Sequence, residues 1–191
     1  MKYLIVGIAA IVAMTGCSTR SNFYQLQSRD TNITKHISSF GSRVIGVDQV
    51  GLADYLDKPQ IVTRISAERL WLHEEDRWIG ALDKNIQSLL TKNLSRILPR
   101  YTFLASPWDE PIEERYRIYV DIERFDGDCN GTVTLDARWS LVDREKSRLL
   151  DGEKVHYVRQ AVPTIDGIVA AQSRMVECLS RRIAKKIRRD L

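Results

Sequence analysis

Residues 115–141 read RYRIYVDIERFDGDCNGTVTLDARWSL, and this stretch decides the fold class. On both sides of its centre, apolar side chains occupy every second position, which is typical of β-strands with one buried face. The centre contains Asn130-Gly131, a pair that tolerates the positive φ angles of a tight turn. The stretch therefore predicts two strands joined by a hairpin turn.

The same turn contains the pattern Asp126-x-Asp128-x-Asn130-Gly131, which is also the opening of a calcium-binding EF-hand loop. An EF-hand loop ends with a bidentate glutamate at its twelfth position and lies between two helices. Counted from Asp126, the twelfth position is Ala137, and the flanking segments alternate as strands do. We therefore interpret the motif as a turn without a metal site, with weak calcium binding by Asp126 and Asp128 as the alternative.

A first amphipathic helix is predicted from Trp78 to Leu98, where Pro99 ends it. Its apolar side chains recur at spacings of three and four: Trp78, Leu82, Ile86, Leu89, Leu90, Leu94 and Ile97. The opposite side is expected to carry Asp83, Lys84, Gln87, Ser88, Lys92, Ser95 and Arg96. Such a helix needs another layer against which to bury its apolar stripe.

A second amphipathic helix is predicted from Thr164 to Leu191. Further strands are predicted at residues 22–26, 43–50, 60–65, 68–73 and 154–162. Half-buried strands need a cover on one face, and two amphipathic helices supply it. We expect an α/β (α+β) two-layer sandwich, in which a mixed, largely antiparallel sheet carries both long helices on one face.

The amino terminus has the form of a bacterial secretion signal, because Lys2 precedes an almost wholly apolar run at residues 3–13. Thr15 and Gly16 then lead directly into Cys17. This order resembles the lipobox of bacterial lipoproteins, although Met14 stands where leucine is usual. In a lipobox the thiol receives diacylglycerol, the leader is removed and the new amino group is acylated.

We therefore predict a signal peptide at residues 1–16 and lipidation of Cys17. The alternatives are an ordinary secretion signal with a chance cysteine, or an uncleaved membrane anchor. Three acyl chains hold a protein on a bilayer far more firmly than one chain does. Ser18 is not the aspartate that retains such lipoproteins in the inner membrane, so the resemblance implies the inner leaflet of the outer membrane, with the protein facing the periplasm.

The mature chain is expected to be one domain, because residues 17–191 have a length suited to a single core. Residues 17–22 are predicted to be a lipidated tether and residues 23–191 a single domain. The whole chain carries 29 basic and 25 acidic side chains, and the leader removes one of the basic ones, Lys2. The remaining excess is too small to indicate a nucleic-acid-binding protein.

Two further cysteines, Cys129 and Cys178, would lie in an oxidising compartment. An even pair there is most simply a disulfide, and we predict that bond. It would tie the hairpin turn to the carboxy-terminal helix. Two separate thiols are the alternative.

Basic residues crowd into the last eleven positions: Arg181, Arg182, Lys185, Lys186, Arg188 and Arg189. Cations in the last turns of a helix complement its macrodipole and keep an exposed face solvated. The alternative is contact with anionic head groups or an acidic partner. The first interpretation is favoured, because the charges lie beside the apolar stripe in the ordinary amphipathic way.

The sequence contains no pattern that indicates catalysis. His73-Glu74-Glu75-Asp76-Arg77 begins like a zinc-protease helix, but Arg77 stands where the second histidine is required. There is no G-x-S-x-G elbow and no phosphate-binding glycine loop. We expect no catalytic residue and no cofactor.

Several stretches together resemble the PqiC-type lipoproteins, also described as ABC-type transport auxiliary lipoproteins. They follow one another in the expected order: Phe23-Tyr24-Gln25-Leu26, Val47-Asp48-Gln49-Val50, Asp54-Tyr55-Leu56, Trp78 to Pro99, Phe125, Gly131, Val133, Trp139 and Leu141. The resemblance implies a non-catalytic component of the paraquat-inducible Pqi transport system.

In such systems an MCE-domain protein, anchored in the inner membrane, spans the periplasm and carries lipid between membranes. The resemblance implies that the lipoprotein docks the far end of this PqiB-like partner at the outer membrane. It also implies a homo-oligomer, arranged as a ring. The alternatives are a stand-alone lipid- or small-ligand-binding envelope lipoprotein and an envelope enzyme, and the resemblance does not assign partner-binding residues.

Overall fold

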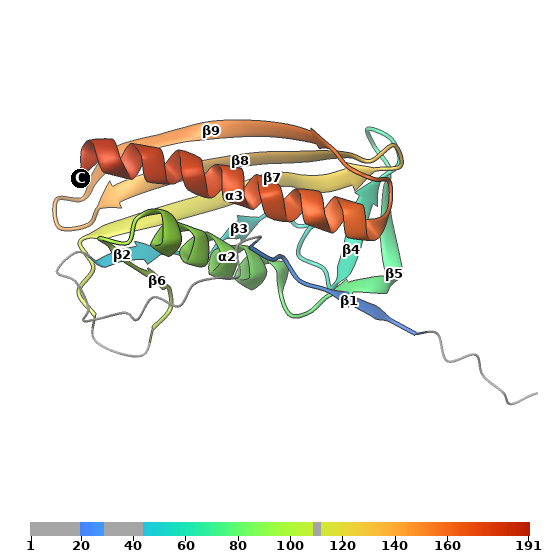
Figure 1. The fold of residues 1–191 in the computed structure, drawn as a ribbon, viewed down its shortest axis with the longest axis horizontal. Helices are drawn as coiled ribbons and strands as arrows, with labels where there is room; N and C mark the ends of the chain where they lie inside the picture. The colour runs from blue at the N-terminus through green and yellow to red at the C-terminus, as the bar shows by residue number, and fades with distance from the viewer. Residues whose placement is uncertain (1–19, 29–43, 109–111) are drawn as a thin grey trace, which may run out of the picture.

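The computed structural model describes residues 20–28, 44–108 and 112–191, so the predicted leader and Cys17 lie outside the described residues. Figure 1 shows a sheet with two helices in front of it. The strands are β1 (Asn22–Tyr24), β2 (Val44–Val47), β3 (Gly51–Leu52), β4 (Gln60–Arg64), β5 (Leu70–Trp78), β6 (Thr102–Ala105), β7 (Tyr116–Asp128), β8 (Thr132–Asp143) and β9 (Arg148–Gln160). The helices are α2 (Leu82–Ile97) and α3 (Ile165–Asp190).

The long strand β7 organises the sheet. One of its edges pairs antiparallel with β8 along nearly its whole length, and β8 pairs in the same way with β9. The other edge meets three short parallel strands in turn, β2, β3 and β4. Beyond β7 the sheet therefore divides into two branches, β2–β6 and β4–β5–β1. The prediction of a mixed sheet with largely antiparallel pairing is confirmed.

The turn between β7 and β8 is the predicted hairpin turn. Gly131 adopts a φ of 81°, which is in the left-handed region that favours glycine. The carboxylate of Asp128 accepts hydrogen bonds from the backbone N–H of Asn130 at 2.9 Å and of Thr132 at 2.8 Å. A Cβ at Gly131 would also overlap the carbonyl oxygen of Ala161. Both the backbone angle and the space therefore require glycine here.

Both helices cover the same face of the sheet, as predicted (Figure 1). α2 lies over the β2–β6 branch, and α3 runs across β7, β8 and β9. The core between the layers includes the fully buried Trp139, Phe125 and Met175. In the part of the chain that the structure describes, no helix is both long enough and apolar enough to cross a bilayer.

Several boundaries differ from the prediction, and β9 begins at Arg148 rather than at residue 154. The first helix begins at Leu82 rather than Trp78, because β5 extends to Trp78 and Gly80, with a φ of 77°, separates the strand from the helix. The sequence predicts that β5 ends at residue 73, since the charged residues 74–77 do not alternate with apolar ones. The last residues of β5 are nevertheless in the sheet, because β1 pairs in parallel with residues 76–78.

Buried amide side chains attach the helices to the sheet. Gln87 of α2 donates to the carbonyl oxygens of Val47 at 3.1 Å and Ser106 at 2.7 Å. Gln172 of α3 donates to the carbonyl oxygen of Phe125 at 2.9 Å. The expectation that Gln87 lies on the solvent side is wrong, because these two backbone carbonyls, of β2 and of the segment after β6, give its amide partners inside the protein.

Candidate functional site

Asp126 is a fully buried carboxylate near the end of β7, with a side-chain exposure of 0%. A Cβ at the next residue, Gly127, would contact Ile168 of α3, so Gly127 faces the helices. Neighbouring side chains of a strand point to opposite faces. Asp126 therefore lies on the outer face of the sheet, away from the helices. Burial there requires cover from another part of the chain.

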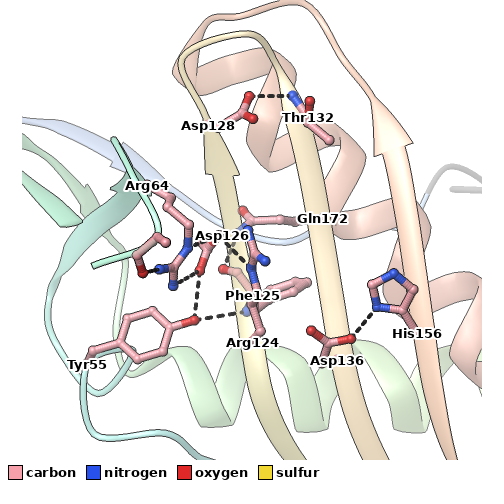
Figure 2. A network of polar contacts seen from close by, with 11 residues as sticks. Tyr55, Arg64, Arg124, Phe125, Asp126, Asp128, Thr132, Asp136, His156 and Gln172 are labelled. Atoms are coloured by element: carbon pink, nitrogen blue, oxygen red, sulfur yellow. Dashed lines mark hydrogen bonds and ion pairs between the residues drawn. The ribbon is translucent and has the colours of Figure 1, made fainter. Parts of the chain in front are cut away.

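Three side chains supply that cover and converge on Asp126, as Figure 2 shows. The hydroxyl of Tyr55 donates to the carboxylate at 2.8 Å. The guanidinium of Arg64 donates through Nη2 at 2.9 Å and through Nε at 3.2 Å, and Arg124 donates through Nε at 3.0 Å. We call these four residues the Asp126 cluster.

The cluster joins three separate segments. Arg64 ends β4, Tyr55 lies in the turn that follows β3, and Arg124 and Asp126 belong to β7. Arg64 also donates to the carbonyl oxygen of Ala67 in the β4–β5 turn at 2.9 Å. The cluster therefore fixes the β4–β5 hairpin and the 53–58 turn against the central strand.

The electrostatics of the cluster favour one protonation state. Burial raises the pKa of Tyr55 to about 12, and the Asp126 carboxylate contributes to this rise. The hydrogen bond to Asp126 is the main cause that raises the pKa of Arg64. At neutral pH the phenol therefore keeps its proton and the guanidinium its charge. Tyr55 is thus unsuited to act as a base or nucleophile, and the cluster supports structure rather than proton transfer.

The calcium alternative for Asp126 and Asp128 is contradicted by this geometry. Asp126 is bound by two arginines and a tyrosine, and one oxygen of Asp128 accepts the backbone amides of the turn. Among residues 20–28, 44–108 and 112–191 there is no group of three or more His, Cys, Asp or Glu side chains placed to hold a metal ion.

The outer face of β7, β8 and β9 carries cross-strand ion pairs next to the Asp126 cluster. Figure 2 shows His156 of β9 beside Asp136 of β8, with Nδ1 2.5 Å from the carboxylate. Arg138 pairs with Asp121 at 3.7 Å, and Lys154 with Glu123 at 3.6 Å. All of the last four side chains are more than half exposed, so this is a solvated charged surface.

The predicted bond between Cys129 and Cys178 is absent, because both are free thiols in the structure. Cys129 is exposed in the β7–β8 turn, beside the point where Ile168 of α3 meets Gly127. Cys178 lies ten residues farther along α3 than Ile168. Ten helical residues rise by about 15 Å, whereas a disulfide needs Cα atoms within roughly 7 Å of each other. The helix thus carries Cys178 away from the turn, and the even cysteine count is misleading.

The basic carboxy-terminal tract attaches α3 to β9. Arg182 binds Glu153 through two hydrogen bonds of 2.6 and 2.8 Å, and this guanidinium lowers the pKa of Glu153. The carboxylate of Asp151 lies 3.1 Å from Nζ of Lys186 and 2.6 Å from Nη2 of Arg189. These intramolecular ion pairs agree with the structural interpretation of the tract, because they hold the end of α3 against β9.

Exposed apolar side chains gather at one end of the sheet. Arg64 of β4 is opposite Asp128 of β7 in the sheet register, so the β4–β5 turn lies beside the β7–β8 turn. At the same end, the backbone N–H of Ala161 donates to the carbonyl oxygen of Gly131. The exposed apolar residues of these segments are Ile65, Trp71, Leu72 and Val162. We call them the hairpin end. Trp71 and Leu72 are successive residues of β5 and point to opposite faces of the sheet, so the exposed Trp71 is the candidate protein-binding residue on its face.

Sequence patterns do not identify the Asp126 cluster, because its members are distant in the chain and their pairing depends on the sheet register. The sequence singles out Tyr55 only within Asp54-Tyr55-Leu56, and Asp126 only within the turn motif. An arginine at the end of an apolar strand, as at Arg64, is the one local signal of a buried partner.

Comparison with known proteins identifies the family. The model for the ABC-type transport auxiliary lipoprotein component matches residues 24–184, from β1 through most of α3. The chain therefore belongs to this family, whose members are transport components rather than enzymes. It is a transport-associated lipoprotein of the cell envelope.

Among named relatives, the chain is 29% identical over 144 residues to the intermembrane transport lipoprotein PqiC of Escherichia coli (strain K12), with 74% of each chain covered. A solved structure of a protein from Xanthomonas campestris shares the fold, with a TM-score of 0.70 and 16% identity over 89% of this chain and 98% of the other. The PelC dodecamer of Paraburkholderia phytofirmans has a TM-score of 0.50 and 10% identity, covering 78% of this chain and 90% of PelC. At such low identities, the two structural similarities concern the fold alone.

Proposed function

We propose that this protein docks a periplasm-spanning MCE-domain protein at the outer membrane, as the non-catalytic lipoprotein of an intermembrane lipid transport system. The observation that carries the proposal is the family match over residues 24–184, together with the similarity to a lipoprotein named for intermembrane transport. Within the proposal, residues 1–16 are a signal peptide, residues 17–22 a tether and residues 23–191 the domain. Acylated Cys17 holds the domain at the inner leaflet of the outer membrane, facing the periplasm.

The hairpin end is the proposed contact for the partner. β1 follows the tether closely and pairs with the carboxy-terminal part of β5, whereas Trp71 lies seven residues back along β5 from Trp78. Strand geometry makes that separation roughly 20 Å. Trp71, with 56% of its surface exposed, is therefore separated along β5 from the residues that pair with β1, and it is open to a partner.

A homo-oligomeric ring is part of the proposal. Among the described strands, β6 pairs only with β2 and therefore leaves one edge open for contact with another copy of the chain. Head-to-tail contacts through such an edge close into rings when the rotation permits. PelC, which shares the fold, is a dodecamer. Native mass spectrometry of the full-length protein in detergent should show one closed oligomer, and a monomer at every concentration would contradict the ring.

The alternative of a stand-alone lipid- or small-ligand-binding lipoprotein requires a site suited to an apolar ligand. A hollow of about 370 Å³ is lined by Arg182, Lys185, Lys186 and Arg189. Its lining is cationic, and three of these side chains already pair with acidic residues. This hollow does not favour an apolar ligand.

The test is affinity purification of the tagged full-length protein from detergent-solubilised envelopes after mild crosslinking, with mass spectrometry of the proteins and lipids recovered. We expect the parent protein to recover an MCE-domain protein, the Trp71→Ser variant to recover less of it, and the Cys17→Ala variant to recover none. Leu149→Ser is the matched control, because Leu149 is also highly exposed but lies on β9, at the other edge of the sheet. Recovery of phospholipid without any protein partner would replace the docking function by the stand-alone alternative.

A further inference from the structure

Two large apolar side chains are exposed beside each other at the β1 edge of the sheet. Phe23 is 64% exposed and Ile79 is 54% exposed. Tyr24 and Trp78 are register partners that both pack into the core. Phe23 and Ile79 are each next in the chain to one of these core residues, and their exposure shows that both side chains point away from the core.

The backbone holds these two residues in a fixed relationship. Phe23 is paired with Arg77, and the amide of Ile79 donates to the carbonyl oxygen of Tyr24 at 2.8 Å. Ile79 is therefore near Phe23, two positions beyond its register partner. Arg77, the register partner of Phe23, lies beside both residues. We call Phe23, Arg77 and Ile79 the edge patch.

The length of chain before the edge patch limits where the bilayer lies. Phe23 comes six positions after Cys17 in the sequence. A fully extended segment of that length spans roughly 20 Å. β1 is the terminal strand of its branch, so no other described strand lies outside it. Acyl chains on Cys17 would therefore bring the bilayer surface within reach of the edge patch and not of the β9 edge.

We propose that the edge patch inserts into the headgroup region of the bilayer that holds Cys17, so that the domain rests on the membrane through this edge. The proposal deepens the proposed function and rests on its acylated Cys17. The apolar side chains of Phe23 and Ile79 suit the boundary between head groups and acyl chains. The guanidinium of Arg77 is partly exposed, and it is placed to meet lipid phosphates at that depth.

Charges near the patch are mixed and set the depth of insertion. Arg77 donates through Nε to the carbonyl oxygen of Glu74 at 2.9 Å, and its Nη2 is 3.5 Å from the Glu74 carboxylate. Asp76 accepts a hydrogen bond from Asn22 at 2.9 Å. These acidic groups disfavour the acyl region, so contact is expected at the interface only.

The test measures the contact with lipid directly in the full-length, acylated protein. Phe23→Trp and Ile79→Trp variants are reconstituted into phosphatidylethanolamine and phosphatidylglycerol vesicles, with and without bromine on the upper acyl carbons. The emission added by each new tryptophan is compared with that of the parent. Leu149→Trp is the matched control, because Leu149 is 63% exposed at the opposite edge of the sheet.

We expect the brominated chains to reduce the added emission of Phe23→Trp and Ile79→Trp by roughly two-fold, as for side chains at the headgroup boundary, and to leave Leu149→Trp unchanged. Acylated protein in which all three variants are equally unquenched would overturn the edge patch while leaving the anchor intact. If the new tryptophans are not quenched by bromine but become shielded as the protein concentration rises, the membrane contact is overturned. The patch would then be assigned to contact with a second copy of the chain. Mass spectrometry that finds no acyl chain on Cys17 would overturn the anchor and the patch together.

Discussion

Nη2 of Arg64 lies 2.9 Å from a carboxylate oxygen of Asp126, whose side chain is completely buried. The pair connects β4 to β7 on the outer face of the sheet, where the two strands share only a short stretch of parallel pairing. Removing one partner of a buried ion pair leaves the other charge without compensation. The β4–β5 hairpin, and with it the hairpin end, is therefore expected to depend on this contact.

Asp126 would lose two of its hydrogen bonds inside the protein in the Arg64→Ala variant. This substitution should lower the free energy of unfolding by about 3 kcal/mol. The measurement is urea unfolding of the domain followed by circular dichroism. Arg138→Ala is the control, because its ion pair with Asp121 is more than half exposed and such a pair contributes less than about 1 kcal/mol. Equal effects of the two substitutions would show that Asp126 is compensated without Arg64.

Tyr55 should make the stability depend on alkaline pH. Its pKa is raised from 10.0 to about 12, so the unfolded chain releases the phenolic proton at a lower pH than the folded protein. The stability due to this group is complete below pH 10 and is lost as the pH rises towards 12. Tyr55→Phe should make the decline shallower over that range, and it should remove a late-titrating phenolate from the absorbance titration. A phenolate of Tyr55 that appears near pH 10 would contradict this environment.

Glycine at position 131 should be required for two reasons that a matched pair of substitutions can separate. Gly131→Ala combines a positive φ with a Cβ that overlaps a carbonyl oxygen, whereas Gly80→Ala has a φ of 77° in open space. We expect losses in unfolding free energy of about 3 kcal/mol for Gly131→Ala and about 1 kcal/mol for Gly80→Ala. Similar losses would mean that the hairpin moves to accommodate the added methyl group.

The sheet and both helices are predictable because their signals are local. Apolar residues alternate along β7 and β8, and they recur at helical spacing along α2 and α3. Asn130-Gly131 marks the turn for the same reason. The charged end of β5 is not predictable in this way, because pairing with β1 rather than burial on one face keeps those residues in the sheet.

The Asp126 cluster and the hairpin end are not predictable from local patterns. The sequence assigns Asp126 to a turn motif, but in the structure it is bound by Arg64 and Tyr55, which are far from it in the chain. Such contacts depend on which strands become neighbours across β7 and in which register. The disulfide prediction failed for the related reason that the number of cysteines says nothing of the distance between them.

Free thiols at Cys129 and Cys178 give the last prediction. The protein isolated from an oxidising environment should contain no bond between these cysteines, because α3 carries Cys178 well beyond the level of the turn. A thiol reagent under native conditions should label the exposed Cys129 rapidly. It should label Cys178 more slowly, since that side chain is half-buried near Tyr157, whose pKa is raised by burial and by the Cys178 sulfur.

Peptide mapping without reduction measures this directly. Cys129→Ser should also leave the free energy of unfolding nearly unchanged, whereas loss of a native disulfide would lower it by about 2–5 kcal/mol. A Cys129–Cys178 peptide in the map would require α3 to shift along the sheet from the register fixed by Gln172 and Arg182. Recovery of both cysteines as singly modified peptides, with Cys129 labelled first, would confirm the arrangement of the helix over the hairpin.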